Sequence, residues 1–216
     1  MKLYTYFRSS AAYRVRMALN YKSIPYEMEP VHLVRDGGQH KTPAYRAVNP
    51  QMRVPSLELD DGTVIVQSPA ILEYLEEVHP EPALLPVDPA ARAKVRAVAA
   101  VIGCDIHPLN NLCVLNYLKG ELGNDQDTVN RWYDHWITEG FAAVEALIAP
   151  NGASSGRFAC GDTPSLADVY IVPQVFNARR FNVPLDAYPT IQAVDAACAE
   201  IPAFADAAPG NQPDAE

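Results

Sequence analysis

Four prolines in the stretch from His79 through Pro89 divide this chain into two parts with different sequence patterns. A segment with this proline density is extended and stiff, which is typical of a linker between domains. Strand-like and helical segments alternate before it, whereas the pattern after it is helical and rich in alanine. The order of the first part favours a small mixed sheet flanked by helices. The sequence therefore predicts an α/β domain over residues 1–82, a linker over 83–89 and an all-helical domain over 90–216.

The first domain begins with a bulky, partly aromatic strand at Leu3–Tyr6, followed by a helix that starts near Ser9. A second strand is expected at 25–31, and 43–48 forms a short helical turn. Strands at 54–59 and 64–66 flank Asp60-Asp61-Gly62, which is a strong hairpin turn. A further helix begins at Gln67-Ser68-Pro69, with the serine as N-cap and the proline at the first position.

The second domain is expected to contain helices at 90–122, 128–149 and 190–199, and a further helix that starts at Ser165–Asp168 and that Pro173 should bend. Pro108 should bend or break the first of them. Ser165 and Asp168 have the spacing of a capping box, which marks an ordinary helix start. A flexible loop is expected at Asn151–Gly156, and the polar residues 209–216 are expected to form a loose tail.

The charge balance argues against nucleic acid and anionic membranes as partners. The chain has 17 lysines and arginines against 26 acidic residues, a formal net charge of −9, whereas both partners require clustered positive charge. No apolar run is long enough to span a bilayer, and no signal-peptide core is present, so we expect a cytoplasmic protein. The cysteines and histidines lack metal-binding or redox spacing, which predicts no metal site.

The connection from the first strand into its helix is a candidate anion site. A helix N-terminus presents free backbone N–H groups and the positive end of the helix dipole. The hydroxyl of Ser9 or Ser10 can accept a backbone N–H there and still donate its own proton outward, for example to a thiolate. The alternative interpretation is that both serines only cap the helix.

Several motifs together resemble the zeta class of the glutathione transferases, the family that contains the maleylacetoacetate and maleylpyruvate isomerases. The resemblance covers nearly the whole chain. It depends on Tyr6–Ser10 with Tyr13–Arg16, Asn49-Pro50, Val54-Pro55, Gln67-Ser68, Cys104–Asn111, Gly161–Pro164 and Asn177–Phe181. It implies a glutathione transferase fold, with a thioredoxin-like N-terminal domain and an all-α C-terminal domain, and a homodimer.

The resemblance also implies which residues bind glutathione. Ser9 and Ser10 match the serine pair that holds the glutathione sulfur, and Ala11 stands where the family often has cysteine. A cis-proline is expected at Val54-Pro55, and Gln67 and Ser68 are expected to contact the γ-glutamyl end. The candidates for the glycyl end are Gln39, His40, Gln51 and Arg53. Asp105 and His107 are expected near the peptide. A solvated loop for the glycyl-end residues, and a structural role for His107, are the alternatives.

The activity implied is glutathione-dependent cis–trans isomerisation of a small dicarboxylic keto acid. Carboxylates favour arginine, so Arg8 is the first substrate-binding candidate, with Arg180 second and Arg179 as its rival. Arg14 and Arg16 lie within the first helix and are interpreted as structural or surface ion-pairing residues. Leu112-Cys113 stands where some maleylpyruvate isomerases carry a further arginine, which favours maleylacetoacetate slightly.

Three other functions remain to be distinguished. A zeta-type transferase that conjugates or dehalogenates small α-halo acids would consume glutathione, whereas an isomerase would not. A glutaredoxin-like oxidoreductase needs a cysteine near the first helix, and the chain has none before Cys104. A non-catalytic glutathione-binding module should have lost the glutathione contacts, but Ser9, Val54, Gln67 and Ser68 are present.

Overall fold

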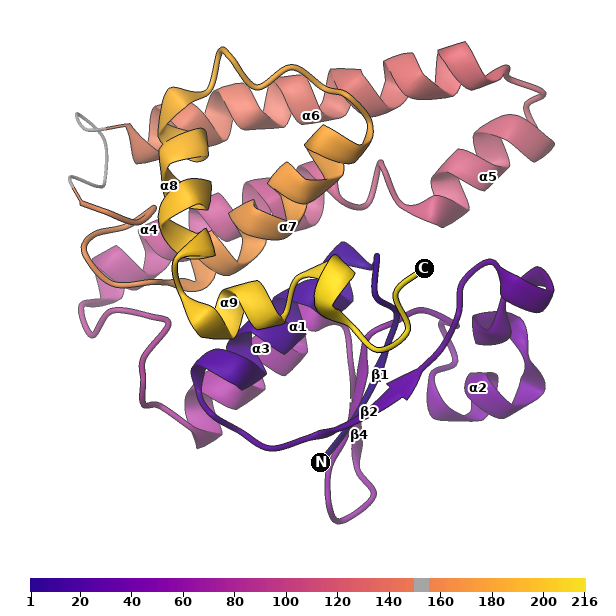
Figure 1. The fold of residues 1–216 in the computed structure, drawn as a ribbon, viewed down its shortest axis with the longest axis horizontal. Coiled ribbons are helices and arrows are strands. Elements are labelled where there is room, and N and C mark those ends of the chain that lie inside the picture. The colour runs from indigo at the N-terminus through magenta and orange to yellow at the C-terminus, as the bar shows by residue number, and fades with distance from the viewer. Residues whose placement is uncertain (150–155) are drawn as a thin grey trace. The chain divides into compact units, whose positions relative to one another are not determined.

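The computed structural model describes residues 1–149 and 156–216, so nearly all of the loop expected at Asn151–Gly156 lies outside the described residues. The chain forms two compact units (Figure 1). The N-terminal unit comprises residues 1–83 together with 199–216, and the helical unit comprises 84–198. The second unit is therefore shorter than the domain expected at 90–216, because the last part of the chain packs with the first.

The N-terminal unit is built on a four-stranded mixed sheet with the strand order β2-β1-β3-β4. β1 (Lys2–Thr5) pairs in parallel with β2 (Glu27–Pro30) and antiparallel with β3 (Ser56–Glu58), which in turn pairs antiparallel with β4 (Val64–Val66). The predicted hairpin is confirmed, with Gly62 at a φ of 86° in its turn. Glycine suits this position because a side chain is strained at positive φ.

The helices of the sheet region are α1 (Ser10–Tyr21), α2 (Pro43–Val48) and α3 (Ser68–Val78), with 3₁₀ turns η1 (Arg35–Gly37) and η2 (Gln39–Lys41) before α2. α1 packs against α3. The predicted cap of α3 is wrong by one residue, because Ser68 is already helical and Gln67 occupies the N-cap with a φ of 72°. Glutamine rarely adopts this conformation, so the sequence did not indicate it.

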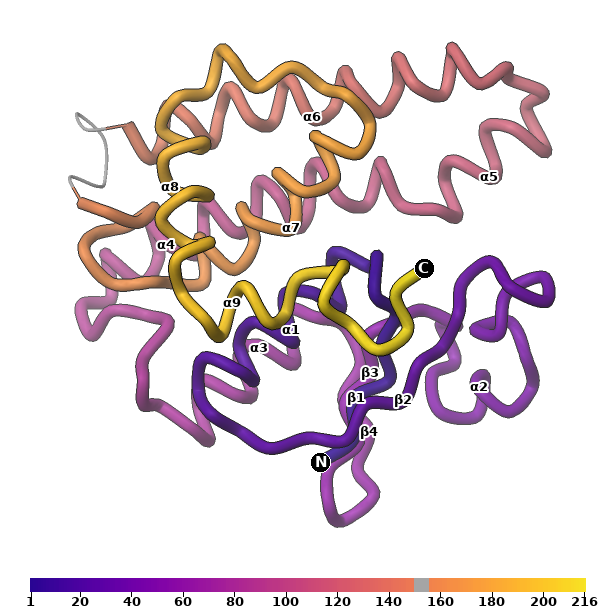
Figure 2. The backbone as a smooth tube through the Cα atoms, viewed as in Figure 1, coloured from indigo at the N-terminus to yellow at the C-terminus, as the bar shows by residue number. Residues whose placement is uncertain are grey.

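The C-terminal segment is ordered and packs on the N-terminal unit, so the prediction of a loose tail is wrong. It contains α9 (Pro202–Asp206) and the 3₁₀ turn η4 (Pro209–Asn211), and its path can be followed in Figure 2. α9 packs on α1, where the rings of Phe204 and Tyr21 lie 5.5 Å apart. Gln212 is buried, and its amide donates to the carbonyls of Asp206 (2.8 Å) and Ala208 (2.9 Å).

The helical unit contains α4 (Pro89–Ala100), a π-helical turn η3 (Val101–Ile106), α5 (Leu112–Gly120), α6 (Gln126–Ile148), α7 (Leu166–Arg180) and α8 (Pro189–Ala199). The predicted interruption at Pro108 is confirmed, because it lies between η3 and α5. No helix in the described part of the chain is both long and apolar enough to cross a membrane.

The capping box predicted at the start of α7 is confirmed. Ser165 is the N-cap, and the fully buried carboxylate of Asp168 accepts hydrogen bonds from the Ser165 N–H (2.7 Å), the Ser165 hydroxyl (2.7 Å) and the Ala159 N–H (2.8 Å). Burial raises the pKa of Asp168, whereas these hydrogen bonds oppose that rise. The carboxylate thus joins the helix start to the preceding segment.

Candidate functional site

The register of the sheet brings four connections of the N-terminal unit to one end of the sheet. Tyr4 of β1 lies opposite Ser56 of β3, Ser56 lies opposite Val66 of β4, and Thr5 pairs with Pro30 of β2. The residues after β1, after β2, before β3 and after β4 therefore share one edge. This edge holds seven of the predicted site residues: Arg8, Ser9, Ser10, Val54, Pro55, Gln67 and Ser68.

A small apolar cluster supports these connections. It consists of Tyr6, Phe7, Val31, Tyr45 and Val54, which are all buried. Its members come from the residues after β1 and β2, from α2 and from the residue before Pro55. Because packed side chains fix the backbone that carries them, the site is built on rigid connections.

Ser9 is the N-cap of α1, as the sequence predicted. Its backbone is extended, and its Oγ accepts the Ala12 N–H at 3.2 Å. A hydroxyl that accepts this bond retains its own proton as a donor. Ser10 follows as the first helical residue and is buried. The Ser9 hydroxyl thus lies at the positive end of the α1 dipole, where a negative charge is stabilised.

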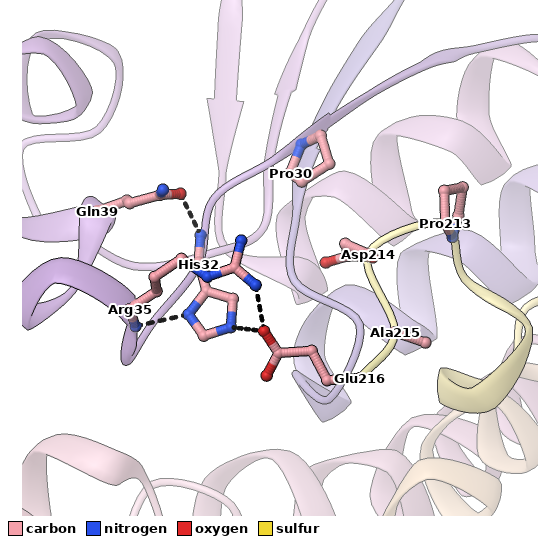
Figure 3. Close-up of a pocket in the computed structure, with 8 residues that line it drawn as sticks. All are labelled: Pro30, His32, Arg35, Gln39, Pro213, Asp214, Ala215 and Glu216. Carbon is pink, nitrogen blue, oxygen red and sulfur yellow. Dashed lines mark hydrogen bonds and ion pairs between the residues drawn. The ribbon is translucent and has the colours of Figure 1, made fainter.

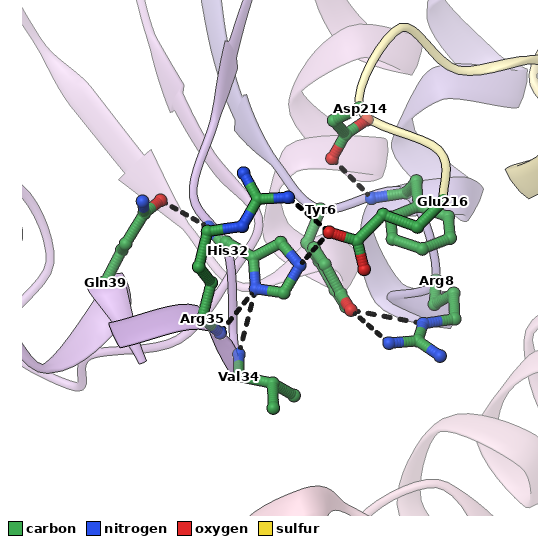
Figure 4. Close-up of polar contacts among 9 residues, drawn as sticks. Tyr6, Arg8, His32, Val34, Arg35, Gln39, Asp214 and Glu216 are labelled. Carbon is green, nitrogen blue, oxygen red and sulfur yellow. Dashed lines mark hydrogen bonds and ion pairs between the residues drawn. The ribbon is translucent and has the colours of Figure 1, made fainter. Parts of the chain in front are cut away.

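Arg8 is held by aromatic rings of its own connection. Its Nε and Nη2 donate to the Tyr6 hydroxyl at 3.1 Å and 2.7 Å (Figure 4). Its guanidinium lies 4.9 Å from the Phe7 ring centre. These contacts orient the side chain without neutralising its charge. Within the described part of the chain, no carboxylate pairs with Arg8, so its charge is available to an anionic ligand.

Arg16 fixes the backbone that carries Arg8 and Ser9. It is fully buried, and it donates to Thr5 Oγ1 (3.0 Å) and to the carbonyls of Tyr6 (3.4 Å), Phe7 (3.0 Å) and Ala207 (3.1 Å). Burial lowers the pKa of Arg16 to about 10, so the guanidinium stays charged at neutral pH. Arg14 is also buried. The structural interpretation of both arginines therefore holds, and the surface alternative is wrong.

The Val54–Pro55 peptide bond is cis, as the resemblance implied. Two buried side chains hold the turn before it: Asn49 Nδ2 and the Tyr45 hydroxyl each donate to the Arg53 carbonyl at 2.7 Å. Among the described residues, the backbone of Val54 has no hydrogen-bond partner. The segment thus presents unpaired backbone groups next to the edge that carries Ser9.

The start of α3 supplies a second helix N-terminus at this edge. Ser68 is buried, whereas Gln67 is exposed and its side-chain amide donates to Gln51 Oε1. This contact joins the turn before Val54 to the start of α3. Gln51, which the sequence offered only as one candidate among loop residues, is therefore part of the same edge.

Gln39 and His40 lie in η2, beyond β2. Gln39 pairs twice with His32: its N–H donates to the His32 carbonyl (2.8 Å), and its Oε1 accepts the His32 N–H (2.9 Å). Burial lowers the pKa of His40. Gly38, at a φ of 103°, has no room for a side chain, because a Cβ there would lie 2.6 Å from the His40 ring. Nothing in the local sequence pattern indicated the pairing of Gln39 with His32.

The remaining predicted residues belong to the helical unit. Asp105 is exposed in the π-helical turn η3, and His107 follows it. Arg179 pairs with Asp195 at 2.6 Å, whereas Arg180 lies 5.1 Å from the Phe181 ring and has no acidic partner among the described residues. Arg180 thus keeps the more available charge. No group of His, Cys, Asp or Glu in the described ranges is placed to hold a metal ion.

Comparison with known proteins assigns this arrangement to a family. Residues 8–78 match the model of the glutathione S-transferase N-terminal domain. The chain is 55% identical over 214 residues to maleylacetoacetate isomerase of Pseudomonas aeruginosa. This alignment covers 99% of this chain and 98% of the relative.

Two solved structures extend the similarity to the fold. One is the holo structure of a maleylpyruvate isomerase, described as a bacterial zeta-class glutathione S-transferase (TM-score 0.95, 51% identity, 100% of both chains). The other is a maleylacetoacetate isomerase of Methylobacterium extorquens with bound malonate and glutathione (TM-score 0.95, 37% identity, 100% of both chains). The chain therefore belongs to the zeta class of the glutathione transferases, the family of the maleylacetoacetate and maleylpyruvate isomerases.

Proposed function

We propose that this protein is a glutathione-dependent cis–trans isomerase that converts maleylacetoacetate, or the related maleylpyruvate, into its fumaryl isomer. Relatives that share more than half of their residues with this chain carry these activities in their names. The observation that carries the proposal is the Ser9 hydroxyl, which caps α1 and still has a proton to donate. A hydroxyl in this position suits a thiolate ligand.

The residues at the edge of the sheet fit glutathione. The unpaired backbone of Val54 suits the cysteinyl part of a peptide, which would pair with it as an added strand does. The N-terminus of α3, with Gln67 and Ser68, suits the γ-glutamyl carboxylate. Gln39 and His40 are proposed at the glycyl end, and Asp105 and His107 are proposed as further contacts to the peptide.

Bound glutathione supplies a thiolate that adds reversibly to a conjugated cis double bond and thereby permits rotation about it. Ser9 donates its hydroxyl proton to the sulfur as a hydrogen bond, and α1 directs its dipole toward the same atom. Both effects favour the thiolate over the thiol, whose ordinary pKa is about 8.5. Ser10 is proposed as the second hydroxyl of this site. Substrate and product are isomers, so the reaction needs no net transfer of a proton or an electron.

The arginines suit the carboxylates of the keto acid. Arg8 extends from the same connection as Ser9, and Tyr6 and Phe7 orient its guanidinium. We assign it to a substrate carboxylate and to the enolate charge that develops when the double bond is attacked. Arg180 is the second candidate and is favoured over Arg179, because Arg179 is paired with Asp195.

Variants of Ser9 can separate the catalytic role from simple capping. Ser9→Thr retains both the cap and the donor, so turnover should stay within about fivefold of wild type. Ser9→Asp retains the cap, since aspartate is a good N-cap residue, but it offers no proton and repels a thiolate. Its turnover should fall at least a hundredfold while its thermal unfolding midpoint stays close to that of wild type. Initial rates are measured with each cis acid at catalytic amounts of glutathione.

Three outcomes would contradict the proposal. Near-normal turnover by Ser9→Asp would reduce the serine to a helix cap. A rate that does not depend on added glutathione would exclude the thiolate route. Glutathione is measured at the end of each reaction, because net consumption would instead indicate a conjugating or dehalogenating transferase.

We further propose that the protein acts as a cytoplasmic homodimer in the degradation of aromatic compounds, tyrosine among them. This proposal follows from the family alone. Light scattering of the purified chain tests the dimer, and a mass of one chain at micromolar concentration would contradict it.

A further inference from the structure

A polar cavity lies within the N-terminal unit, between the connection after β2 and the C-terminal segment (Figure 3). Its volume is about 350 Å³. One wall carries His32, Arg35 and Gln39, and the other carries Asp214 and Glu216. The cavity is thus lined by hydrogen-bond donors on one side and carboxylates on the other.

The imidazole of His32 is locked as a hydrogen-bond donor toward this cavity. Its Nδ1 accepts the backbone N–H groups of Val34 (3.1 Å) and Arg35 (2.7 Å) (Figure 4). A nitrogen that accepts in this way carries no proton, so the proton of the neutral ring is on Nε2. The two bonds from Gln39 to the His32 backbone fix the residue further.

The Nε2 donor is buried and lacks a well-aligned acceptor. The His32 side chain is 9% exposed, and among the described residues Nε2 has no partner with hydrogen-bond geometry. Glu216 Oε1 lies 3.3 Å from Nε2, within ion-pair distance but outside hydrogen-bond geometry. A buried donor without a well-aligned acceptor is costly, so a site of this kind favours a ligand that accepts the proton well.

Glu216 indicates what that ligand is. The same Oε1 also contacts the Arg35 guanidinium, so two donors converge on one carboxylate oxygen. Arg35 lowers the pKa of the Glu216 carboxyl, which keeps it ionised. Both side chains of this ion pair are about half exposed, and exposed ion pairs are weak and exchangeable.

We propose that His32 and Arg35 form a binding site for the carboxylate of a small organic acid, and that Glu216 occupies this site as a tethered competitor. The site lies next to Tyr6, whose ring is 4.8 Å from the His32 ring and whose hydroxyl holds Arg8. It borders the proposed glutathione site, with which it shares Gln39, and its test needs no turnover. A free acid binds to His32 and Arg35 when the Glu216 side chain moves out of the site.

The size of the effect follows from the weakness of the ion pair. An exposed pair favours its closed form by about one- to fivefold, and a competitor of this strength reduces the apparent affinity of a free ligand by about two- to sixfold. Removing the Glu216 carboxylate should therefore raise the affinity for a free carboxylate by the same factor. Raising the ionic strength should reduce the difference in affinity between Glu216→Ala and wild type, because the ion pair is exposed.

The experiment titrates malonate, and separately glutathione, into the full chain by calorimetry. The variants are Glu216→Ala and the control Glu77→Ala, which removes an equal charge from an exposed position on α3 of the same unit. Glu216→Ala should bind malonate about two- to sixfold more tightly than wild type, and Glu77→Ala should match wild type. Adding Arg35→Gln to Glu216→Ala should weaken malonate binding to below the wild-type affinity.

The two ligands distinguish the sources of the carboxylate. A gain in malonate affinity in Glu216→Ala assigns the site to a free organic acid. A gain in glutathione affinity alone assigns the site to a carboxylate of the peptide. Equal affinities of wild type and Glu216→Ala for both ligands would overturn the proposal, as would an equal gain in Glu77→Ala. Inactivity toward the cis acids with an intact malonate gain would refute only the proposed isomerase function.

Discussion

Arg16 in the N-terminal unit and Asp168 in the helical unit are both fully buried charged side chains, but their partners lie at different distances along the chain. Asp168 accepts its shortest hydrogen bonds from Ser165 and Ala159, at most nine residues away, and a longer one of 3.9 Å from the thiol of Cys198, 30 residues away. Arg16 binds Thr5 to Phe7 and also the carbonyl of Ala207, 191 residues away. A local network of this kind stabilises one helix start, whereas the long-range one joins the candidate site to the far end of the chain.

The largest effect is expected for Arg16→Met, which retains the apolar stem but removes the guanidinium. It leaves three buried carbonyls without their donor, and we expect the free energy of unfolding to fall by about 3–4 kcal/mol. Glutathione affinity should fall as well, because the connection that carries Ser9 loses its anchor. Urea denaturation and calorimetric titration measure the two effects. Arg46 is exposed, and Arg46→Met is the control. It should change neither the free energy of unfolding nor the glutathione affinity by much.

Asp168→Ala should give a smaller loss, about 2–3 kcal/mol, because its carboxylate mainly serves the donors of Ser165 and Ala159, and its contact with the Cys198 thiol is long and weak. Glutathione affinity should not change in Asp168→Ala, whereas it should fall in Arg16→Met. The exposed Asp186→Ala serves as control. If Asp168→Ala weakened glutathione binding as much as Arg16→Met does, the contrast between a local and a long-range network would fail.

The smallest effect concerns a partly buried charge on the sheet, that of Glu58. The Tyr4 hydroxyl donates to Glu58 at 2.7 Å, and this hydrogen bond is the main cause that raises the pKa of Tyr4 to about 12. A raised pKa means that the folded state holds the proton more tightly, so the contribution is full below pH 10 and is lost as pH rises toward 12. Tyr4→Phe should therefore flatten the decline in unfolding free energy across this window.

Glu58→Gln removes the same charged partner and provides the check on Tyr4→Phe. It should flatten the alkaline decline to a similar extent, and combining the two changes should add little. An unchanged decline in both variants would show that other groups determine the stability at high pH.

What could be predicted from the sequence follows the same division between local and distant contacts. The hairpin at Gly62, the capping box at Asp168 and the cap at Ser9 each depend on residues a few positions apart, and all three are confirmed. The role of Arg16 and the ordered C-terminal segment depend on contacts across most of the chain, which no local pattern reveals. The cis bond before Pro55 was expected only from the family resemblance.

The candidate site was predictable to the same degree. The helix start at Ser9 carried its own local signal, whereas the pairing of Gln39 with His32 arises only when the connection after β2 folds back on itself. The left-handed backbone of Gln67 runs against the ordinary preference of glutamine, so the sequence placed the cap one residue too late.

The return of the C-terminal segment to α1 has a consequence for synthesis on the ribosome. Residues 199–216 belong to the N-terminal unit, so that unit, although begun first, is finished last. Until they emerge, Arg16 lacks the Ala207 carbonyl and the Phe7 N–H lacks the Asp214 carboxylate that accepts it at 3.0 Å. A nascent chain that stops after the helical unit would carry Ser9 and Arg8 on a connection without its final anchors.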